Sequence, residues 1–226
     1  ALIAAEVLGV PYEQVRVIRG DTDSAPFATG SGGSVVTFSM GNAVLRAAEN
    51  ARSRILALAA EQLEVSEDQL ELRDSRIIDR NDEENAMSLS DVARMSLGTT
   101  GGPIVGHGTF AKQPSASTIS AQIAKIEVNP DTGQLDVLKY VGSLDCGRAI
   151  HAMNVEGQME GGAVQGISWG VMEQMQYGED GRNINANLLD YRIPTSKDVP
   201  YVESVICEIP SNNGPFGVKG VGEPPI

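Results

Sequence analysis

The sequence predicts an α+β protein in which helices are mixed with antiparallel sheets. Apolar residues recur at helical spacing over residues 39–63, and a second helical pattern covers residues 153–175. Alternating apolar residues over 119–128 and 135–144 predict two strands, because Asn129-Pro130-Asp131-Thr132-Gly133 between them is a tight-turn sequence. Long helices together with paired strands indicate the α+β class.

Shorter elements are predicted around these patterns. In chain order they are a helix over residues 1–8 that Gly9 ends, a strand over 15–18, a hairpin of 70–72 with 77–78, a polar turn over 80–85, a helix capped by Ser90, a strand over 104–110 and a strand over 201–209. The strands over 104–110, 119–128 and 135–144 are expected to form an antiparallel meander.

The second helical pattern contains more glycine than a helix usually carries. Each glycine inside a helix costs about 1 kcal/mol relative to alanine, and the pattern contains Gly157, Gly161, Gly162, Gly166 and Gly170. Close approach of another helix, a backbone segment or a cofactor is the expected compensation. Gln158, Gln165 and Trp169 share one face with Gly162, so either a polar ligand or a buried helix contact would explain the pattern.

Composition excludes several classes of protein. The chain has 226 residues and a formal net charge of −13, which disfavours nucleic acid and anionic membranes as partners because both would repel it. No apolar run approaches the roughly 20 residues that span a bilayer. Two cysteines without close pairing favour a reducing, cytoplasmic compartment over a disulfide scaffold. The first residue is not Met, and we expect the chain to be a piece of something longer or one of several subunits.

The tail over residues 214–225 is the strongest candidate for chemistry. Its glycines let the backbone approach a ligand closely, and its prolines forbid a helix. Glu223 directly precedes Pro224, so its backbone is pushed toward extended geometry and its carboxylate is held on a constrained chain. A general base is presented in this way, although an ordinary loop with a solvated acid has the same local sequence.

A second glycine-rich segment, Gly30-Ser31-Gly32-Gly33-Ser34, directly precedes the first long helix. Such a turn exposes backbone N–H groups that can hold an anion at the start of a helix. The segment lacks both the P-loop ending and the spacing of a dinucleotide-binding loop. A phosphate or cofactor nest and a plain helix-entry loop both remain open.

Three other motifs do not indicate an active site. Gly166-Ile167-Ser168-Trp169-Gly170 matches a nucleophile elbow, but both histidines precede Ser168 and the flanking pattern is helical, which excludes a serine hydrolase. The histidines and cysteines show no zinc-ligand spacing, so no side chain is predicted to bind a metal. Cys146 lies near Arg148, which could lower its pKa, but a structural cysteine at a strand end explains it better.

Five motifs occur in one order along the chain: Gly20-Asp21-Thr22-Asp23, Gly32-Gly33-Ser34-Val35, Asp145-Cys146-Gly147-Arg148, Gly157 to Gly166, and Lys219-Gly220-Val221-Gly222-Glu223-Pro224-Pro225. Together they resemble the second half of the molybdenum-binding subunit of the xanthine dehydrogenase and aldehyde oxidoreductase family. The resemblance implies a molybdenum-binding domain of xanthine dehydrogenase type over residues 1–226, as one region or as the subdomains 1–100 and 101–226.

The resemblance also implies a molybdenum hydroxylase, which inserts a water-derived oxygen into a C–H bond of an aromatic N-heterocycle such as a purine, or of an aldehyde. It implies that Glu223 is the general base and that Gly32, Gly33 and Ser34 pack on the cofactor. It also implies that Gln158 contacts the cofactor near the metal. The implied cofactor is molybdenum-molybdopterin, in its plain or its cytosine-dinucleotide form.

The implied partners are the remaining half of the molybdenum subunit and the domains or chains that carry [2Fe–2S] clusters and FAD, in a cytoplasmic hetero-oligomer. The Gly-Glu-Pro-Pro ending is more similar to N-heterocycle hydroxylases than to carbon monoxide dehydrogenases, and His151-Ala152 departs from the frequent Asn-Pro of the family. The alternative is a non-catalytic scaffold or assembly subunit that holds no cofactor.

Overall fold

The structure is a computed structural model that describes residues 1–18, 20–23, 25, 28, 30–110 and 116–226. It divides into two compact units. One unit comprises residues 1–31 and 36–113, and the other comprises residues 32–35 and 114–226. The loop Gly32–Val35 therefore belongs to the second unit, although the chain on both sides of it belongs to the first.

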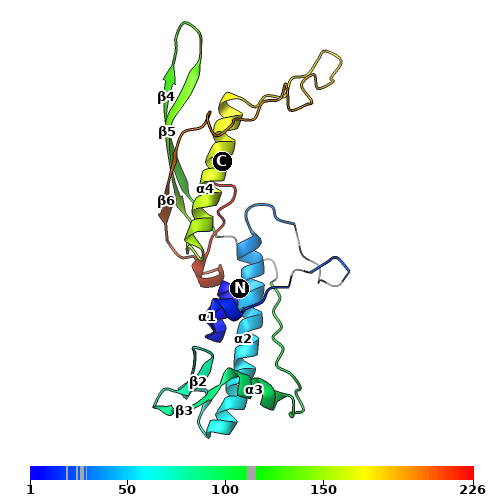
Figure 1. Cartoon of the computed structure of the whole chain (residues 1–226), viewed down its shortest axis with the longest axis vertical. Coiled ribbons are helices and arrows are strands. Elements are labelled where there is room, and N and C mark those ends of the chain that lie inside the picture. The colour runs from blue at the N-terminus through cyan, green and yellow to red at the C-terminus, as the bar shows by residue number, and fades with distance from the viewer. Residues whose placement is uncertain (19, 24, 26–27, 29, 111–115) are drawn as a thin grey trace. The chain divides into compact units, whose positions relative to one another are not determined.

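The first unit is built on one long helix, α2. Its elements in chain order are α1 (Leu2–Leu8), a 3-10 turn (Tyr12–Gln14), α2 (Val36–Leu63), a 3-10 turn (Glu67–Gln69), β1 (Leu70–Arg73), β2 (Arg76–Asp79), β3 (Asp82–Ser88) and α3 (Leu89–Ser96). The three strands form an antiparallel sheet in the order β1-β2-β3, which lies with α3 beside the C-terminal half of α2 (Figure 1). Its buried core contains Ile55, Ala59, Leu70, Ile77 and Val92.

Local signals at helix ends act largely as predicted. Gly9 ends α1 in the left-handed conformation, with φ of 58°, and a Cβ at this position would lie 2.4 Å from the Leu72 carbonyl oxygen. The predicted cap Ser90 is wrong by two residues. Ser88 is the N-cap of α3, because it is extended at the end of β3 and its Oγ accepts the Asp91 N–H at 3.1 Å.

The segment over residues 104–110 is not the predicted strand. Its backbone carbonyl groups are bonded to arginine side chains of α2 instead of to a neighbouring strand. Arg46 donates to the Thr109 carbonyl at 2.7 Å, and Arg54 donates to the Val105 carbonyl at 3.0 Å. Because these groups find partners on a helix, the alternating sequence forms an extended segment without a sheet.

Two further predictions about the first unit are wrong. Residues 15–18 form no strand, and Val17 and Ile18 are 64% and 81% exposed, so no sheet covers their apolar side chains. The polar turn predicted over 80–85 is mostly part of β3, which begins at Asp82. A polar sequence can form a strand here because the side chains at its start face solvent while the backbone pairs with β2.

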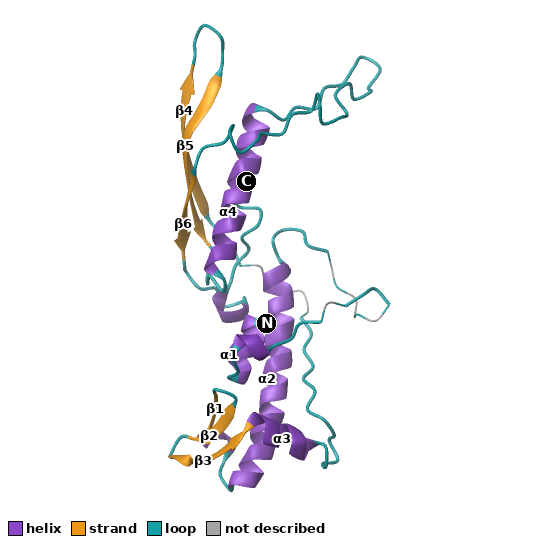
Figure 2. Cartoon of the chain, in the orientation of Figure 1, coloured by secondary structure: helices purple, strands orange, loops and turns teal. Residues whose placement is uncertain are grey.

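The second unit contains a mixed sheet covered by one helix. Its elements are β4 (Ser120–Val128), β5 (Leu135–Asp145), α4 (Ala152–Val171), β6 (Val202–Cys207) and a 3-10 turn (Pro215–Gly217). The sheet order is β4-β5-β6 (Figure 2), with β4 antiparallel to β5 and β6 parallel to β5. The predicted meander is therefore only a hairpin. The third strand is β6, which runs parallel because α4 forms the crossover connection.

The core of the second unit lies between α4 and the sheet. One cluster contains Tyr140, Ala163, Ile167 and Val202, and a second contains Leu144, Cys146 and Met159. The combination of helices with antiparallel and mixed sheets confirms the predicted α+β class. Within the residues that the structure describes, no helix is long and apolar enough to cross a membrane.

Candidate functional site

Glu223 is held at both its backbone and its side chain by the loop Gly32–Val35. Its N–H donates to the Ser34 hydroxyl oxygen at 2.7 Å, and its Oε1 accepts the Gly33 N–H at 3.0 Å. Gly33 and Ser34 have φ of 69° and 58°, a left-handed turn that non-glycine residues seldom adopt. This turn aims one backbone donor and one hydroxyl at the same residue, so the carboxylate has a fixed position although it is exposed.

Gln158, on the first turns of α4, lies beside the same loop. A Cβ at Gly222 would be 3.0 Å from the Gln158 Oε1 and 3.3 Å from the Ser34 Oγ. A Cβ at Gly220 would be 3.1 Å from the Ser34 Cβ. The two glycines are therefore needed because the tail passes closely over both side chains. Among the described residues, the exposed Gln158 side chain has no hydrogen-bond partner.

The structure thus brings together four of the residues singled out from the sequence: Gly33, Ser34, Gln158 and Glu223. Gly32 is exposed in the same loop, and open space surrounds the position its Cβ would take. Gly32 therefore adds a surface without a side chain next to Gly33.

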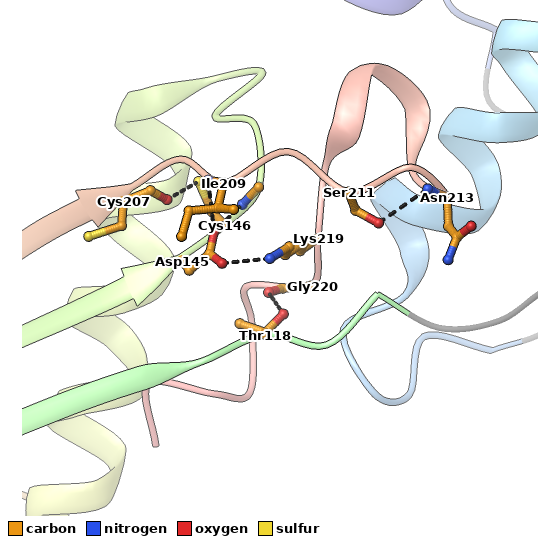
Figure 3. Close-up of polar contacts among 10 residues, drawn as sticks. Thr118, Asp145, Cys146, Cys207, Ile209, Ser211, Asn213, Lys219 and Gly220 are labelled. Atoms are coloured by element: carbon orange, nitrogen blue, oxygen red, sulfur yellow. Dashed lines mark hydrogen bonds and ion pairs between the residues drawn. The ribbon is translucent and has the colours of Figure 1, made fainter.

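Three polar residues that hold the tail were missed by sequence reasoning. The Thr118 hydroxyl donates to the Gly220 carbonyl at 3.0 Å (Figure 3), and the Ser120 hydroxyl donates to the Pro224 carbonyl at 2.9 Å. Gln122 donates to the same carbonyl at 3.1 Å. Small polar residues that alternate with apolar ones resemble the solvent face of a strand, so the sequence carries no signal for this role.

The glycines of α4 fall into two groups. A Cβ at Gly162 would lie 2.8 Å from the Pro225 Cβ, and a Cβ at Gly166 would lie 3.1 Å from the Ile226 carbonyl carbon. The tail backbone is therefore the close neighbour that these two glycines admit. Among the described residues, nothing lies within 4 Å of the Cβ positions of Gly157, Gly161 and Gly170, and the first two leave a bare helix surface near Gln158.

The other motifs have structural roles. Cys146 is fully buried, and this burial raises the pKa of its thiol, which opposes formation of a reactive thiolate. Ser168 is buried and its hydroxyl donates to Glu173, which also accepts the Tyr191 hydroxyl at 2.6 Å. The hydrogen bonds from Ser168 and then Tyr191 lower the pKa of the Glu173 carboxyl. Ser168 is paired with an acid rather than a histidine, in accord with the exclusion of a hydrolase.

In the part of the chain that the structure describes, no group of three or more histidine, cysteine, aspartate or glutamate side chains could hold a metal ion. The site is instead a single carboxylate, a free amide side chain and a bare glycine surface. Such a set suits an organic group that carries its own reactive centre.

The family model of the molybdopterin cofactor-binding domain matches residues 1–200. The chain belongs to this family. The match confirms the resemblance to the molybdenum-binding subunits of the xanthine dehydrogenase family that the five sequence motifs indicate.

Individual relatives cover the tail as well. The chain is 34% identical over 231 residues to the nicotine 6-hydroxylase large subunit of Paenarthrobacter nicotinovorans, covering 99% of this chain and 28% of that protein. It is 31% identical over 229 residues to the xanthine dehydrogenase molybdenum-binding subunit of Escherichia coli O157:H7, covering 99% of this chain and 30% of that protein.

Among solved structures, a reconstituted CO dehydrogenase from Oligotropha carboxidovorans has a TM-score of 0.91 and 29% identity, covering 99% of this chain and 28% of that chain. The molybdopterin cofactor-binding domain described here thus spans less than a third of the length of these relatives.

The residues of the site fit a molybdopterin cofactor. A flat ring system needs a surface without side chains, which Gly157 and Gly161 provide beside the amide of Gln158. The left-handed turn leaves Gly33 exposed next to the Glu223 carboxylate. The Gly33 N–H, the Glu223 carboxylate and the glycine surface of α4 therefore all belong to the second compact unit.

Proposed function

We propose that this chain is the part of a molybdenum hydroxylase that contacts the cofactor and presents the catalytic base. The observation that carries the proposal is the double attachment of Glu223 to Gly33 and Ser34, beside Gln158. A surface glutamate in an ordinary loop has no need of such fixation, whereas a general base must be held within reach of the proton it accepts.

In this proposal each residue of the chain has one task. The bound molybdenum group supplies the oxygen-transfer and redox chemistry. Gly33 occupies Oε1 of Glu223 with its N–H, so Oε2 is the atom that accepts the proton. Ser34 fixes the backbone of the base, and the side-chain amide of Gln158 is the contact to the cofactor. Gly32, Gly33 and the open glycines of α4 let the cofactor approach the backbone.

We assign the substrate to the aromatic N-heterocycles, with aldehydes as the second class. The similarity to a nicotine hydroxylase and to a xanthine dehydrogenase subunit supports this assignment, as does the Gly-Glu-Pro-Pro ending. A CO dehydrogenase shares the fold as well, with a TM-score of 0.91, so likeness of fold supports the cofactor class and not the substrate.

The proposed complex contains further parts. Its cofactor is molybdenum-molybdopterin in the plain or cytosine-dinucleotide form, and electrons leave through [2Fe–2S] clusters to FAD on partner domains or chains. The remaining portion of the molybdenum subunit is a partner as well, because the chain spans less than a third of its relatives. We place this complex in the cytoplasm, with neither nucleic acid nor a membrane as partner.

The test of the proposal is the substitution Glu223→Gln in the native assembly. The glutamine keeps the Oε1 acceptor for Gly33 but cannot act as a base, so turnover should fall by about two to four orders of magnitude while molybdenum content stays unchanged. Glu179→Gln, in an exposed turn, is the matched control and should leave both quantities unchanged. Turnover close to that of the unmodified enzyme would remove Glu223 from the mechanism.

A further inference from the structure

A buried ion pair lies behind the loop that carries Glu223. The Lys219 Nζ and the Asp145 Oδ2 are 2.5 Å apart, and the two side chains are only 11% and 9% exposed. The other carboxylate oxygen, Oδ1, accepts the N–H groups of Gly147 at 3.0 Å and Ile209 at 3.1 Å. Figure 3 shows the Lys219 side chain reaching from the tail to the end of β5. The Asp145 carboxylate therefore joins its own segment at the end of β5 to two others, the segment that follows β6 and the tail.

Backbone contacts around the ion pair join the same segments. The Lys219 N–H donates to the Cys146 carbonyl at 2.9 Å, and the Ser211 N–H donates to the Gly217 carbonyl at 2.9 Å. Gly147 has φ of 73°, and a Cβ there would lie 2.1 Å from the Gly217 carbonyl oxygen. The tail is thus fitted against the ends of β5 and β6 with no room for even a methyl group.

Lys219 precedes Glu223 by only a few residues of the tail. From Lys219 the chain continues through Gly220, whose carbonyl accepts the Thr118 hydroxyl, to Gly222 beside Gln158 and then to Glu223. A shift of Lys219 along the chain direction would move Gly222 relative to Gln158 and Glu223 relative to Ser34. The position of the ion pair therefore determines which tail residue meets the loop Gly32–Val35.

Other ion pairs among the described residues are exposed and have no such role. Lys139 and Glu203, on the neighbouring strands β5 and β6, are 2.8 Å apart with side chains 56% and 47% exposed. Exposed pairs contribute little to stability. Burying Lys219 and Asp145 requires desolvation of both charges, and apolar residues of similar volume are often at least as stable. Stability alone is thus a weak reason for a buried pair at this position.

We propose that Lys219 and Asp145 are positioning residues, which fix the register of the tail and thereby place the Glu223 carboxylate against Gly33 and Ser34. The proposal rests on the proposed function only for the catalytic role of Glu223. The fixation itself is a property of the second unit and can be measured without knowledge of the substrate.

The experiment is amide hydrogen exchange of Lys219→Met in the native assembly, followed by mass spectrometry of peptides. We expect exchange over residues 218–223 to become about ten-fold faster or more, because these amides open without opening the core. Exchange in the interior of α4 and in β5 should not change. In the same preparation kcat should fall by about 100-fold with little change in KM, since the base is misplaced while the substrate site is intact.

Lys139→Met is the matched control, because it breaks an exposed ion pair of the same sheet and should change neither quantity. If Lys219→Met fails to fold with an unpaired buried carboxylate, the double variant Asp145→Asn with Lys219→Met removes both charges and should show the same local exchange. Unchanged exchange over 218–223, or equal acceleration over the whole unit, would overturn the proposal. Retained turnover in Glu223→Gln, with fast local exchange in Lys219→Met, would instead overturn only the role of Glu223.

Discussion

At the scale of single residues, the Asp145 carboxylate lies where burial and hydrogen bonding oppose each other. Burial alone would raise its pKa, but the hydrogen bond from Lys219 and those from the N–H groups of Gly147 and Ile209 outweigh burial and hold the pKa below its ordinary value. The folded state therefore binds this proton less readily than the unfolded state. Its stabilisation is complete above the unfolded pKa of about 3.9 and is lost as the pH falls through the lower folded value.

The substitution Asp145→Asn tests this linkage. At neutral pH it leaves Lys219 buried without its counter-charge, so the free energy of unfolding should fall by about 3–5 kcal/mol. The difference between the two proteins should shrink as the pH is lowered below about 4, because the unmodified protein then protonates Asp145. Urea unfolding of both proteins over this pH range measures the difference in their free energies of unfolding. A difference that stays constant with pH would show that the carboxylate charge is not what stabilises the fold.

The sequence identifies residues of the site where the signal is local, and misses those whose role depends on a distant partner. Glu223 is recognisable because glycines precede it and prolines follow it, and Gln158 because glycines surround it. Asp145 stands 74 positions from Lys219, and nothing in the spacing of the two residues predicts their contact.

At the scale of elements, helix α4 shows that two adjacent glycines can be present in one helix for different structural reasons. Gly162 faces Pro225 so closely that a Cβ would lie 2.8 Å from the proline Cβ, whereas the adjacent Gly161 faces open space. The first glycine is required by packing of the tail. The second has no neighbour within 4 Å among the residues that the structure describes, so its face of α4 is open.

Alanine at these two adjacent positions should therefore act in opposite directions. Gly161→Ala should stabilise the chain by about 0.5–1 kcal/mol, because alanine restricts the unfolded chain and favours the helix. Gly162→Ala should destabilise it by about 1–3 kcal/mol, because the tail must move away. Thermal unfolding of the two variants measures both effects. Destabilisation by Gly161→Ala would mean that this face of α4 is not open.

Elements were predictable where their pattern is complete within one segment. α1, α2, α4 and the β4–β5 hairpin follow from apolar spacing and from the turn at Asn129–Gly133, whose Asn129 oxygen accepts the Asp131 N–H at 2.9 Å. The extended segment over 104–110 was not predictable, because its alternation is that of a strand and only the arginines of α2 decide where its carbonyl groups bond. The parallel direction of β6 follows from a crossover that the strand pattern does not show.

At the scale of the whole molecule, the second unit is discontinuous in sequence. It takes Gly32–Val35 from a region where all neighbouring residues belong to the first unit. The contacts of Gly33 and Ser34 to Glu223 therefore join positions about as far apart as the chain allows, separated by 190 and 189 residues. A domain boundary drawn along the sequence cannot isolate this site, because the unit that holds Glu223 also needs the early loop.

The chain spans less than a third of the length of its relatives, so cofactor content should be measured on the native assembly. If the cofactor contacts described here are only part of its binding site, the chain purified natively with its partner polypeptides should contain about one molybdenum and one pterin per chain. In that complex Gln158→Ala should lower both contents, because it removes the free amide beside Gly222, whereas Gln134→Ala in the exposed β4–β5 hairpin should not. Metal analysis and pterin fluorescence measure the two contents. A native complex that contains neither would favour a scaffold without cofactor, since a scaffold subunit predicts that Gln158→Ala changes assembly and leaves the metal content at zero.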